Sequence, residues 1–345
     1  MIKENNSRYH AFNIVYRFDS TKHQLKSIRH EYYRKNNISS SERSRSMVLS
    51  NEVIRWQRRL DSWISLSLDK PIKKLPPKVL SLLRLAYYEY LMDDNIPVHA
   101  AVDSWVELSK KITNKKLSGL INAVLRKAHL INKKKPIPDQ DLASWQSFPD
   151  WMIANWVNQF GKSKTNKLID YLNHNHGTDL RLNLPIDKVE QGFLDQGISW
   201  SKSPNSKNFI RINSGLRKIL SSQIHLSGKV FVQNRAAGAV VEILNPKPYE
   251  TILDVCAAPG TKSIYIFQKM NQSGNLFASD INSSQVAKSF KYCNKLELLI
   301  DWKVKDATKD IFPMADRILI DAPCTGTGVI SRKPDIKWRK DSKDP

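Results

Sequence analysis

Cysteine is scarce in this 345-residue chain, and its three cysteines, Cys256, Cys293 and Cys324, all lie in the last third. So small and odd a set does not make the disulfide framework of a secreted domain, and we expect a reducing, cytoplasmic compartment. No Cys-x-x-Cys or Cys/His spacing of a zinc motif occurs either, so we expect no metal.

Long hydrophobic runs are also absent from the sequence. No apolar stretch approaches the roughly 20 residues that a helix needs to cross a bilayer. The first six residues are polar and lack the apolar core of a signal peptide. The sequence therefore predicts neither a membrane partner nor secretion.

Acidic residues are outnumbered by basic ones, with 33 Asp and Glu against 55 Lys and Arg, a formal net charge of +22. Such a surplus favours a polyanionic partner, most commonly nucleic acid. The alternative is a general enrichment of lysine on solvated faces. One basic cluster lies where phosphate contacts would position a folded RNA. It consists of Lys110, Lys111, Lys115, Lys116, Arg126, Lys127, Lys133, Lys134 and Lys135.

The chain divides into three predicted domains. Residues 1–135 show apolar residues at helical spacing and no strand-like alternation, which predicts an all-α domain. A charged, proline-bearing linker over 133–138 separates it from a small α+β subdomain over 140–230. Residues 231–345 are expected to form a Rossmann-like α/β domain. Helices are predicted over 9–18, 48–68, 77–92, 97–111, 117–130, 151–172 and 187–196, and strands over 180–184, 198–201 and 209–212.

In the last predicted domain, short strands alternate with helices. We expect strands over 251–255, 275–279, 302–305 and 317–320, and helices over 263–270 and 281–296. This alternation predicts a parallel, doubly wound sheet, whose ligand site lies at the carboxyl ends of the strands.

Three aspartates, Asp280, Asp306 and Asp321, each stand at or just past the end of a predicted strand. The loop after the first strand turns on small residues, which lets a ligand approach the backbone closely. It lacks the glycine pattern of dinucleotide binders and the ending of a phosphate-binding loop, so we expect a nucleoside without a pyrophosphate, such as S-adenosylmethionine. Asp280 would then accept the ribose hydroxyls and Asp306 would bind the adenine amino group. The alternative for each aspartate is a helix N-cap.

Cys324 follows the last predicted strand through Asp321-Ala322-Pro323, which is the layout of a nucleophilic thiol beside a carboxylate. Carbon 5 of a pyrimidine is too weak a nucleophile to take a methyl group from a sulfonium. A thiolate that adds at carbon 6 makes carbon 5 carbanion-like, and the hydrogen of carbon 5 leaves afterwards. We interpret Cys293, on a predicted helix, as packing and Cys256 as shaping the loop.

Two motifs carry a resemblance to a known family. They are Asp-Val-Cys-Ala-Ala-Pro-Gly-Thr-Lys over 254–262 and Asp-Ala-Pro-Cys-Thr-Gly-Thr-Gly-Val-Ile-Ser-Arg-Lys-Pro-Asp-Ile-Lys-Trp over 321–338. With them the chain closely resembles the bacterial rRNA cytosine-C5 methyltransferases of the RsmB (Fmu/Sun) type. Residues 82–90, 96–102 and 119–126 resemble the NusB-like RNA-binding domain at that family's N-terminus. Phe148-Pro149, Trp151, residues 180–183 and residues 232–235 match its linking region.

The resemblance implies S-adenosylmethionine-dependent methylation of carbon 5 of a cytosine in small-subunit rRNA, as free or early-assembly RNA, through a covalent cysteine adduct. The target base would leave its stack to react. Asp280 would hold the ribose and Asp306 the adenine side, while Asp321 would lie between cofactor and cytosine. Thr261 and Asn234 replace the family's usual Gly and Asp, so we expect weaker local packing there. The cofactor's methionine end would be held by Cys256, Ala257, Ala258, Pro259, Gly260, Thr261 and Lys262, with Lys262 also near the target base.

One departure from the family concerns the attacking thiol. The family uses two cysteines: the one at the position of Cys324 mainly helps to release product, and the nucleophile lies in a Thr-Cys-Ser motif farther on. This sequence stops at Pro345, before that motif and before the last strands of the sheet. We therefore expect a shortened, inactive member of the family that still binds cofactor.

Three alternatives stay open at this stage. Cys324 takes over as nucleophile, as a Pro-Cys cysteine does in DNA cytosine methyltransferases. The chain is an RNA-binding module without catalysis. Or the substrate is DNA, against which the NusB-like N-terminus argues.

Overall fold

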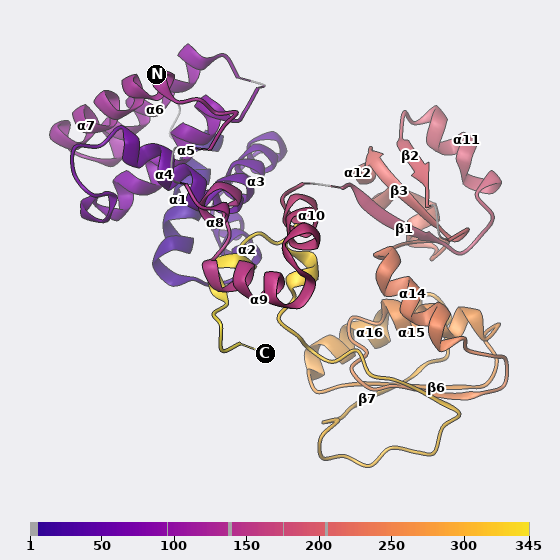
Figure 1. Cartoon of the computed structure of the whole chain (residues 1–345). Helices are drawn as coiled ribbons and strands as arrows, with labels where there is room; N and C mark the ends of the chain where they lie inside the picture. The colour runs from indigo at the N-terminus through magenta and orange to yellow at the C-terminus, as the bar shows by residue number, and fades with distance from the viewer. Residues whose placement is uncertain (1–5, 95, 137–139, 175, 204–205, 345) are drawn as a thin grey trace. The chain divides into compact units, whose positions relative to one another are not determined.

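The computed structural model describes residues 6–94, 96–136, 140–174, 176–203 and 206–344. Asn95, Ile137 and Pro138, which the sequence analysis placed at a helix end and in a linker, lie outside these ranges. The contacts divide the chain into two compact units (Figure 1). The helical unit contains Met1–Asn175 and Thr325–Pro345, and the sheet unit contains His176–Cys324.

The helical unit confirms the predicted all-α fold of the first part of the chain. Its core packs the large side chains of Trp63, Leu83, Tyr87 and Trp105, each at most 1% exposed. Its α-helices are α1 (Ser7–Thr21), α2 (Leu25–Lys35), α3 (Ser40–Arg55), α4 (Gln57–Leu66), α5 (Pro77–Leu91), α6 (Val98–Ile112), α7 (Lys115–Lys127), α8 (Leu142–Gln146), α9 (Asp150–Phe160), α10 (Lys162–Asn173) and α17 (Ile336–Arg339). Short 3-10 turns span η1 (Ile72–Lys74), η2 (Ala128–Leu130) and η3 (Thr327–Val329).

The single helix predicted over 48–68 is wrong, because α3 ends at Arg55 and α4 begins at Gln57. Tertiary contacts replace the helical hydrogen bond at this break. The Ile54 carbonyl accepts from Trp338 Nε1 at 2.7 Å, and the Arg58 N–H donates to Ser147 Oγ at 3.0 Å. The helix predicted over 151–172 is likewise two helices, since Gly161 between α9 and α10 has φ +76.

Helix α2 was not predicted from the sequence. Only Leu25 and Ile28 of this helix are buried, so its apolar periodicity is weak. Gln24 makes no side-chain cap at its start. Instead the Leu25 N–H donates to Asp335 Oδ2 at 3.3 Å, from a residue 310 positions away. A cap supplied from so far along the chain leaves no local signal.

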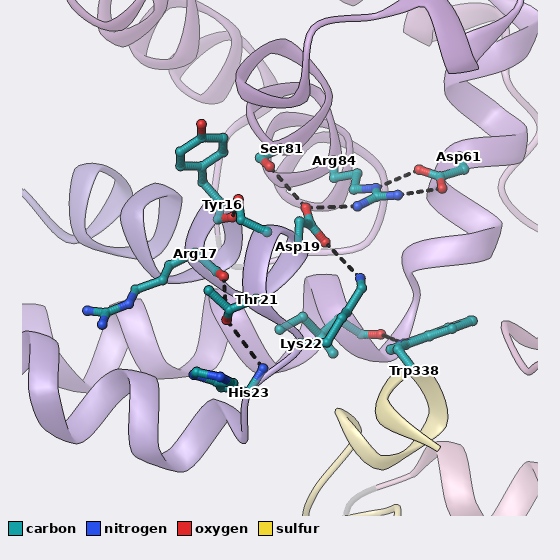
Figure 2. Close-up of polar contacts among 12 residues, drawn as sticks. Tyr16, Arg17, Asp19, Thr21, Lys22, His23, Asp61, Ser81, Arg84 and Trp338 are labelled. Carbon is teal, nitrogen blue, oxygen red and sulfur yellow. Dashed lines mark hydrogen bonds and ion pairs between the residues drawn. The ribbon is translucent and has the colours of Figure 1, made fainter. Parts of the chain in front are cut away.

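A buried ion network joins α1, α4 and α5 of the helical unit (Figure 2). The Arg84 guanidinium donates to both carboxylate oxygens of Asp61, at 2.6 and 2.7 Å, and to Asp19 Oδ2 at 3.0 Å. Ser81 Oγ also donates to Asp19 Oδ2 at 3.0 Å. Burial raises the pKa of the Asp61 carboxyl, and the hydrogen bond from Arg84 opposes that rise. The charges are stable here only because each has its partner.

The sheet unit holds two four-stranded sheets. The first is antiparallel in the order β2-β3-β1-β4 and the second is parallel in the order β7-β6-β5-β8. The strands are β1 (Thr178–Leu182), β2 (Ser199–Lys202), β3 (Phe209–Ser214), β4 (Val230–Val232), β5 (Thr251–Asp254), β6 (Asn275–Asp280), β7 (Asp301–Val304) and β8 (Arg317–Leu319). The helices are α11 (Asp187–Asp195), α12 (Leu216–Leu220), α13 (Gln223–Leu226), α14 (Arg235–Leu244), α15 (Thr261–Lys269) and α16 (Ser283–Lys295).

The parallel sheet has the predicted strands, and the helices α14, α15 and α16 lie on one side of it (Figure 1). Within the described ranges no helix follows β7, because a loop over 305–316 leads to β8. On β8, Leu319 is 6% exposed whereas its neighbours Ile318 and Ile320 are 54% and 65% exposed. The second helical layer of a doubly wound sheet is therefore not seen in the described residues.

Arg181, in the Leu-Arg-Leu-Asn segment of β1, is fully buried and joins the antiparallel sheet to α15. It donates to Gln233 Oε1 at 2.6 Å and to Gln268 Oε1 at 2.5 Å. Its guanidinium lies 4.2 Å from the ring centre of Tyr265. Burial lowers the pKa of Arg181 to about 10. The Arg181 side chain thus joins residues 180–183 to residues 232–235, the two segments that the sequence assigned to a linking region.

The compact units do not follow the predicted domain borders. Contacts place α8, α9, α10 and residues 325–344 with the helical unit, although the sequence pattern put them in the second and third domains. Domains over 1–135, 140–230 and 231–345 stay a prediction. Of the described helices, none has the length and apolar character to cross a membrane.

We predict that Arg84→Ala lowers the free energy of unfolding of the helical unit by about 3–5 kcal/mol, because it leaves Asp61 without its cation and Asp19 with only Lys22, whose Nζ lies 3.8 Å from Asp19 Oδ1. Urea denaturation followed by circular dichroism measures this change. Arg126→Ala, at an exposed position on α7, is the matched control and should change stability by less than about 0.5 kcal/mol. Equal losses in the two variants would contradict the role of the network.

Candidate cofactor and thiol site

The predicted site lies at one edge of the parallel sheet. β5 pairs with β6 on one side and with β8 on the other, all in parallel register. The carboxyl ends of these strands therefore meet at the same edge. β5 ends at Asp254, β6 ends at Asp280, and Asp321 comes two residues after β8. Asp306 comes two residues after β7, which pairs in parallel with β6, so the sheet brings all three selected aspartates to this edge.

Backbone and carboxylate contacts fix the loop between β5 and α15. The Ala257 N–H donates to the Ser279 carbonyl at 2.8 Å, and the Ala258 N–H donates to Asp280 Oδ2 at 3.2 Å. Asp280 Oδ1 accepts from the Asn282 N–H at 2.9 Å. The Ala258-Pro259 peptide bond is cis. Asp280 therefore shapes the loop, and its contact with a ribose stays a prediction.

Gly260 closes this loop with φ +90, a conformation that disfavours other residues. A Cβ at this position would lie 3.0 Å from Cζ2 of Trp302 on β7, so the backbone packs directly against the indole. Thr261 begins α15, where no left-handed backbone is required. The local backbone at position 261 therefore does not require the glycine that the family usually has there.

Lys262 and Asp321 form an ion pair through Lys262 Nζ and Asp321 Oδ2. The Lys262 side chain is 18% exposed and that of Asp321 is 51% exposed, so the pair lies at the rim of the site. Cys324 stands three positions beyond Asp321 and is exposed. The structure thus pairs two predicted catalytic residues and leaves the Cys324 thiol open to solvent.

Asp254 is the site residue that the sequence analysis did not select. It is 1% exposed, and Ser263 Oγ donates to its Oδ2 at 2.7 Å, while its Oδ1 has no partner among the described residues. Burial raises the pKa of Asp254 to about 6; Ser263 and Lys262 oppose this rise, whereas Asp321 and Asp280 add to it. A carboxylate at the end of an otherwise apolar strand was the signal in the sequence.

Asp306 is committed to its own turn. Its Oδ1 accepts from the Thr308 N–H at 2.9 Å and from Thr308 Oγ1 at 2.7 Å, and Lys309 Nζ lies 3.4 Å from its Oδ2. The hydrogen bonds from Thr308 hold the pKa of Asp306 below its ordinary value. Asp306 is thus engaged in a turn and is not the helix N-cap weighed as the alternative, because no helix lies between β7 and β8 among the described residues; contact with adenine stays a prediction.

The three thiols have different surroundings. Burial raises the pKa of Cys256, and Asp280, Asp254 and Asp321 raise it further, so nothing nearby favours its thiolate. Cys293 on α16 is 1% exposed in the core of the sheet unit, and burial raises its pKa as well.

No group of three or more potential metal ligands occurs in the part of the chain that the structure describes.

We predict that Asp254→Asn removes a pH dependence of stability. The pKa of Asp254 is about 6 in the folded chain and 3.8 for the free side chain. The folded state thus binds more protons between these pH values, and the free energy of unfolding falls as pH rises through them. Ionising Asp254 in the folded state costs on the order of 3 kcal/mol of stability above pH 6. Asn cannot ionise, so the variant avoids this loss. The measurement is thermal unfolding of both forms at pH 4.5 and pH 8.

Asp187→Asn, at an exposed position in the first turn of α11, is the control for this prediction. The stability difference between Asp254→Asn and the parent should favour the variant more at pH 8 than at pH 4.5. A difference that is the same at both pH values would contradict the assignment.

Two family models match the chain. Residues 241–345 match the family described as 16S rRNA methyltransferase RsmB/F, and residues 5–129 match the NusB family. Among solved structures, the crystal structure of PH0851 has a TM-score of 0.73 at 21% identity, covering 98% of this chain and 78% of its own. The crystal structure of NSun6 from Pyrococcus horikoshii with SFG has a TM-score of 0.50 at 18% identity, covering 57% and 75%. These likenesses show the fold.

Curated relatives are more similar in sequence. A protein of Synechocystis named probable ribosomal RNA small subunit methyltransferase B is 33% identical, over 89% of this chain and 71% of its own length. A Bacillus subtilis protein of the same name is 31% identical, over 90% and 71%. With the helical NusB-like part and the parallel methyltransferase sheet both present, the chain belongs to the family of ribosomal RNA small subunit methyltransferase B, the rRNA methyltransferases.

Proposed function

We propose that this chain binds S-adenosylmethionine at the carboxyl edge of β5, β6 and β8, and that its reaction is methylation of carbon 5 of a cytosine in small-subunit rRNA. The observation that carries this proposal is the Lys262–Asp321 ion pair beside the loop of residues 255–260, on the same edge as the exposed Cys324. The charged pair adjoins a close backbone turn, and Cys324 follows three positions after Asp321.

The residues of this edge fit the proposed cofactor. Gly260 and the small side chains before it leave the backbone open to a ligand. Asp254 offers a buried carboxylate oxygen without a partner among the described residues, which suits a donor group of a bound ligand. The NSun6 structure from Pyrococcus horikoshii is one with SFG, an S-adenosylmethionine analogue. When bound, S-adenosylmethionine supplies an electrophilic methyl group on a sulfonium.

The proposed chemistry needs a thiolate, a proton acceptor and a cytosine ring held in position. A thiolate forms a bond to carbon 6 of the cytosine, and carbon 5 then takes the methyl group as the carbon–sulfur bond of the donor breaks. The proton of carbon 5 leaves to a base, and the bond between thiol and carbon 6 breaks to release the product. We assign Asp321, which pairs with Lys262, to contact with the cytosine.

We assign Cys324 to product release rather than to attack. The 345 residues contain no Thr-Cys-Ser motif, which holds the attacking thiol in the resembling family. A protein of these residues is therefore proposed to bind cofactor and RNA without turnover. The competing proposal is that Cys324 itself attacks, and its exposure is the observation in its favour.

The proposed RNA partner is small-subunit rRNA in its free or early-assembly form. The first turn of α7 carries Lys115 and Lys116, both exposed, and has no acidic residue. Cations at a helix N-terminus work against the helix dipole, so they do not serve the stability of α7. The Asn114 side chain caps the Leu117 N–H, and the two lysines together with the preceding N–H groups of that turn favour phosphate. Arg126, near the other end of α7, is exposed as well.

The first test of the proposed function measures binding and turnover separately. Isothermal calorimetry of the 345-residue chain with S-adenosylmethionine should show binding. Incubation with small-subunit rRNA and methyl-labelled cofactor should show no transfer, because the attacking thiol is missing. Transfer that bisulfite sequencing maps to a cytosine, and that Cys324→Ser abolishes, would establish Cys324 as the nucleophile. Absence of cofactor binding would overturn the proposal.

The second test concerns RNA. We predict that Lys115→Glu, Lys116→Glu and Arg126→Glu together weaken binding to small-subunit rRNA and flatten its salt dependence. For each phosphate that the variant no longer neutralises, the slope of log K against log salt should fall by about 0.7. Lys73→Glu with Lys74→Glu, both exposed in η1, is the control for altered net charge. Filter binding at several salt concentrations measures the slope, and equal effects of both charge reversals would contradict the assignment.

A further inference from the structure

The segment that follows Cys324 is anchored in the helical unit, although Cys324 itself belongs to the sheet unit. We call residues 329–339 the clasp. In the sequence these residues belong to the segment that matches the methyltransferase family. Their contacts are instead with α2, with the break between α3 and α4, and with α8, α9 and α10 (Figure 1).

The apolar side chains of the clasp are fully integrated into the core. Ile330 is 0% exposed and Ile336 is 4% exposed, in one cluster with Phe148, Met152 and Leu172. Burial of a side chain of this size contributes about 1.5–3 kcal/mol. The clasp is therefore a packed element of the helical unit and not an exposed loop.

Lys337 is the unusual member of the clasp, because its side chain is 0% exposed and its partners are all uncharged. Its Nζ donates to Asn173 Oδ1 at 2.7 Å, to the Ser147 carbonyl at 3.0 Å and to the Arg55 carbonyl at 3.2 Å. It also lies 3.6 Å from the ring centre of Phe148. Burial lowers the pKa of Lys337 well below its ordinary value.

The three donors of the ammonium thus meet three oxygens that come from three separate parts of the chain. Arg55 ends α3, Ser147 follows α8, and Asn173 ends α10. A buried cation is stable only where all its hydrogen bonds are made at once. Lys337 therefore fits the clasp in a single register, and a shift by one residue would leave a charge unpaired.

Neighbouring residues add directional bonds to the same register. Trp338 Nε1 donates to the Ile54 carbonyl at 2.7 Å, and Asp335 Oδ2 accepts from the Leu25 N–H at 3.3 Å. Arg55 Nη2 donates to the Ser331 carbonyl at 2.8 Å. Trp338 appears in Figure 2 beside the residues of α1.

The loop between β8 and the clasp has few bonds of its own. Among the described residues, none makes a hydrogen bond to the backbone of residues 320–325. The Lys262–Asp321 ion pair is the side-chain contact of this loop. Its position therefore depends on that pair and on its two ends, β8 at Leu319 and the clasp at Val329.

We propose that Lys337 is a positioning residue for the Cys324 loop, because it locks the clasp that holds the carboxyl end of residues 320–328. Any effect of this tether on methyl transfer rests on the proposed function, whereas the tether itself does not.

The test uses the 345-residue chain with a nitroxide spin label on Cys324, in a Cys256→Ser background so that one exposed thiol reacts. The variant is Lys337→Met, which keeps the length of the side chain and removes the ammonium. Lys333→Met, at an exposed position of the same clasp, is the matched control. In Lys337→Met the rotational correlation time of the label should fall about twofold or more, because a released loop moves on the nanosecond scale. Lys333→Met should leave the spectrum unchanged.

Trp338→Phe serves as a second variant, because it removes the bond to the Ile54 carbonyl while an aromatic ring stays against the apolar cluster of Ile14 and Phe18; it is expected to preserve the fold if Lys337→Met does not. Hydrogen exchange of residues 329–339 reports whether the clasp is loosened. A loosened clasp with an unchanged label spectrum would overturn the proposal, since a purely structural role in the helical unit predicts that result. A clasp that stays protected in both variants would overturn it too. Neither readout requires cofactor, RNA or turnover, so a failed methylation assay leaves this test intact.

Discussion

The helical unit depends on one interaction, the burial of the Lys337 ammonium among the oxygens of Arg55, Ser147 and Asn173. An uncompensated charge at that position would cost several kcal/mol, so the three elements that supply these oxygens have to keep their relative places. This also explains why the chain breaks its helix at Trp56. The carbonyls of Ile54 and Arg55 bond to the side chains of Trp338 and Lys337.

The same need to satisfy polar groups governs the sheet edge. Asp280 uses both carboxylate oxygens to accept from the Ala258 and Asn282 N–H groups, and Asp306 uses one to accept from Thr308. Asp254 keeps one oxygen without a partner in the described residues. A carboxylate that a sequence pattern assigns to a ligand can therefore be engaged with the backbone, while a buried one that no pattern singled out is left available. Only the hydrogen-bond geometry separates these cases.

Much of the fold and part of the site could be predicted from the sequence. Apolar patterning located the helices from Pro77 and from Pro97 and all four strands of the parallel sheet, because each of these elements carries its apolar residues within one short segment. Periodicity missed α2, whose first N–H is capped by Asp335, and merged α3 with α4. In these cases the deciding partner lies hundreds of residues away, where a local pattern carries no information.

The sequence by itself determined the family and the all-α and parallel-sheet architectures, because these follow from motifs and spacing along short segments; its choice of Lys262, Asp280 and Asp321 for the site stays a prediction. Only the tertiary structure decided three other points. Lys262 pairs with Asp321, Asp254 is a buried carboxylate with a raised pKa, and the residues after Cys324 belong to the helical unit. Each of these depends on desolvation and on partners from distant segments, which exist only once the chain has folded.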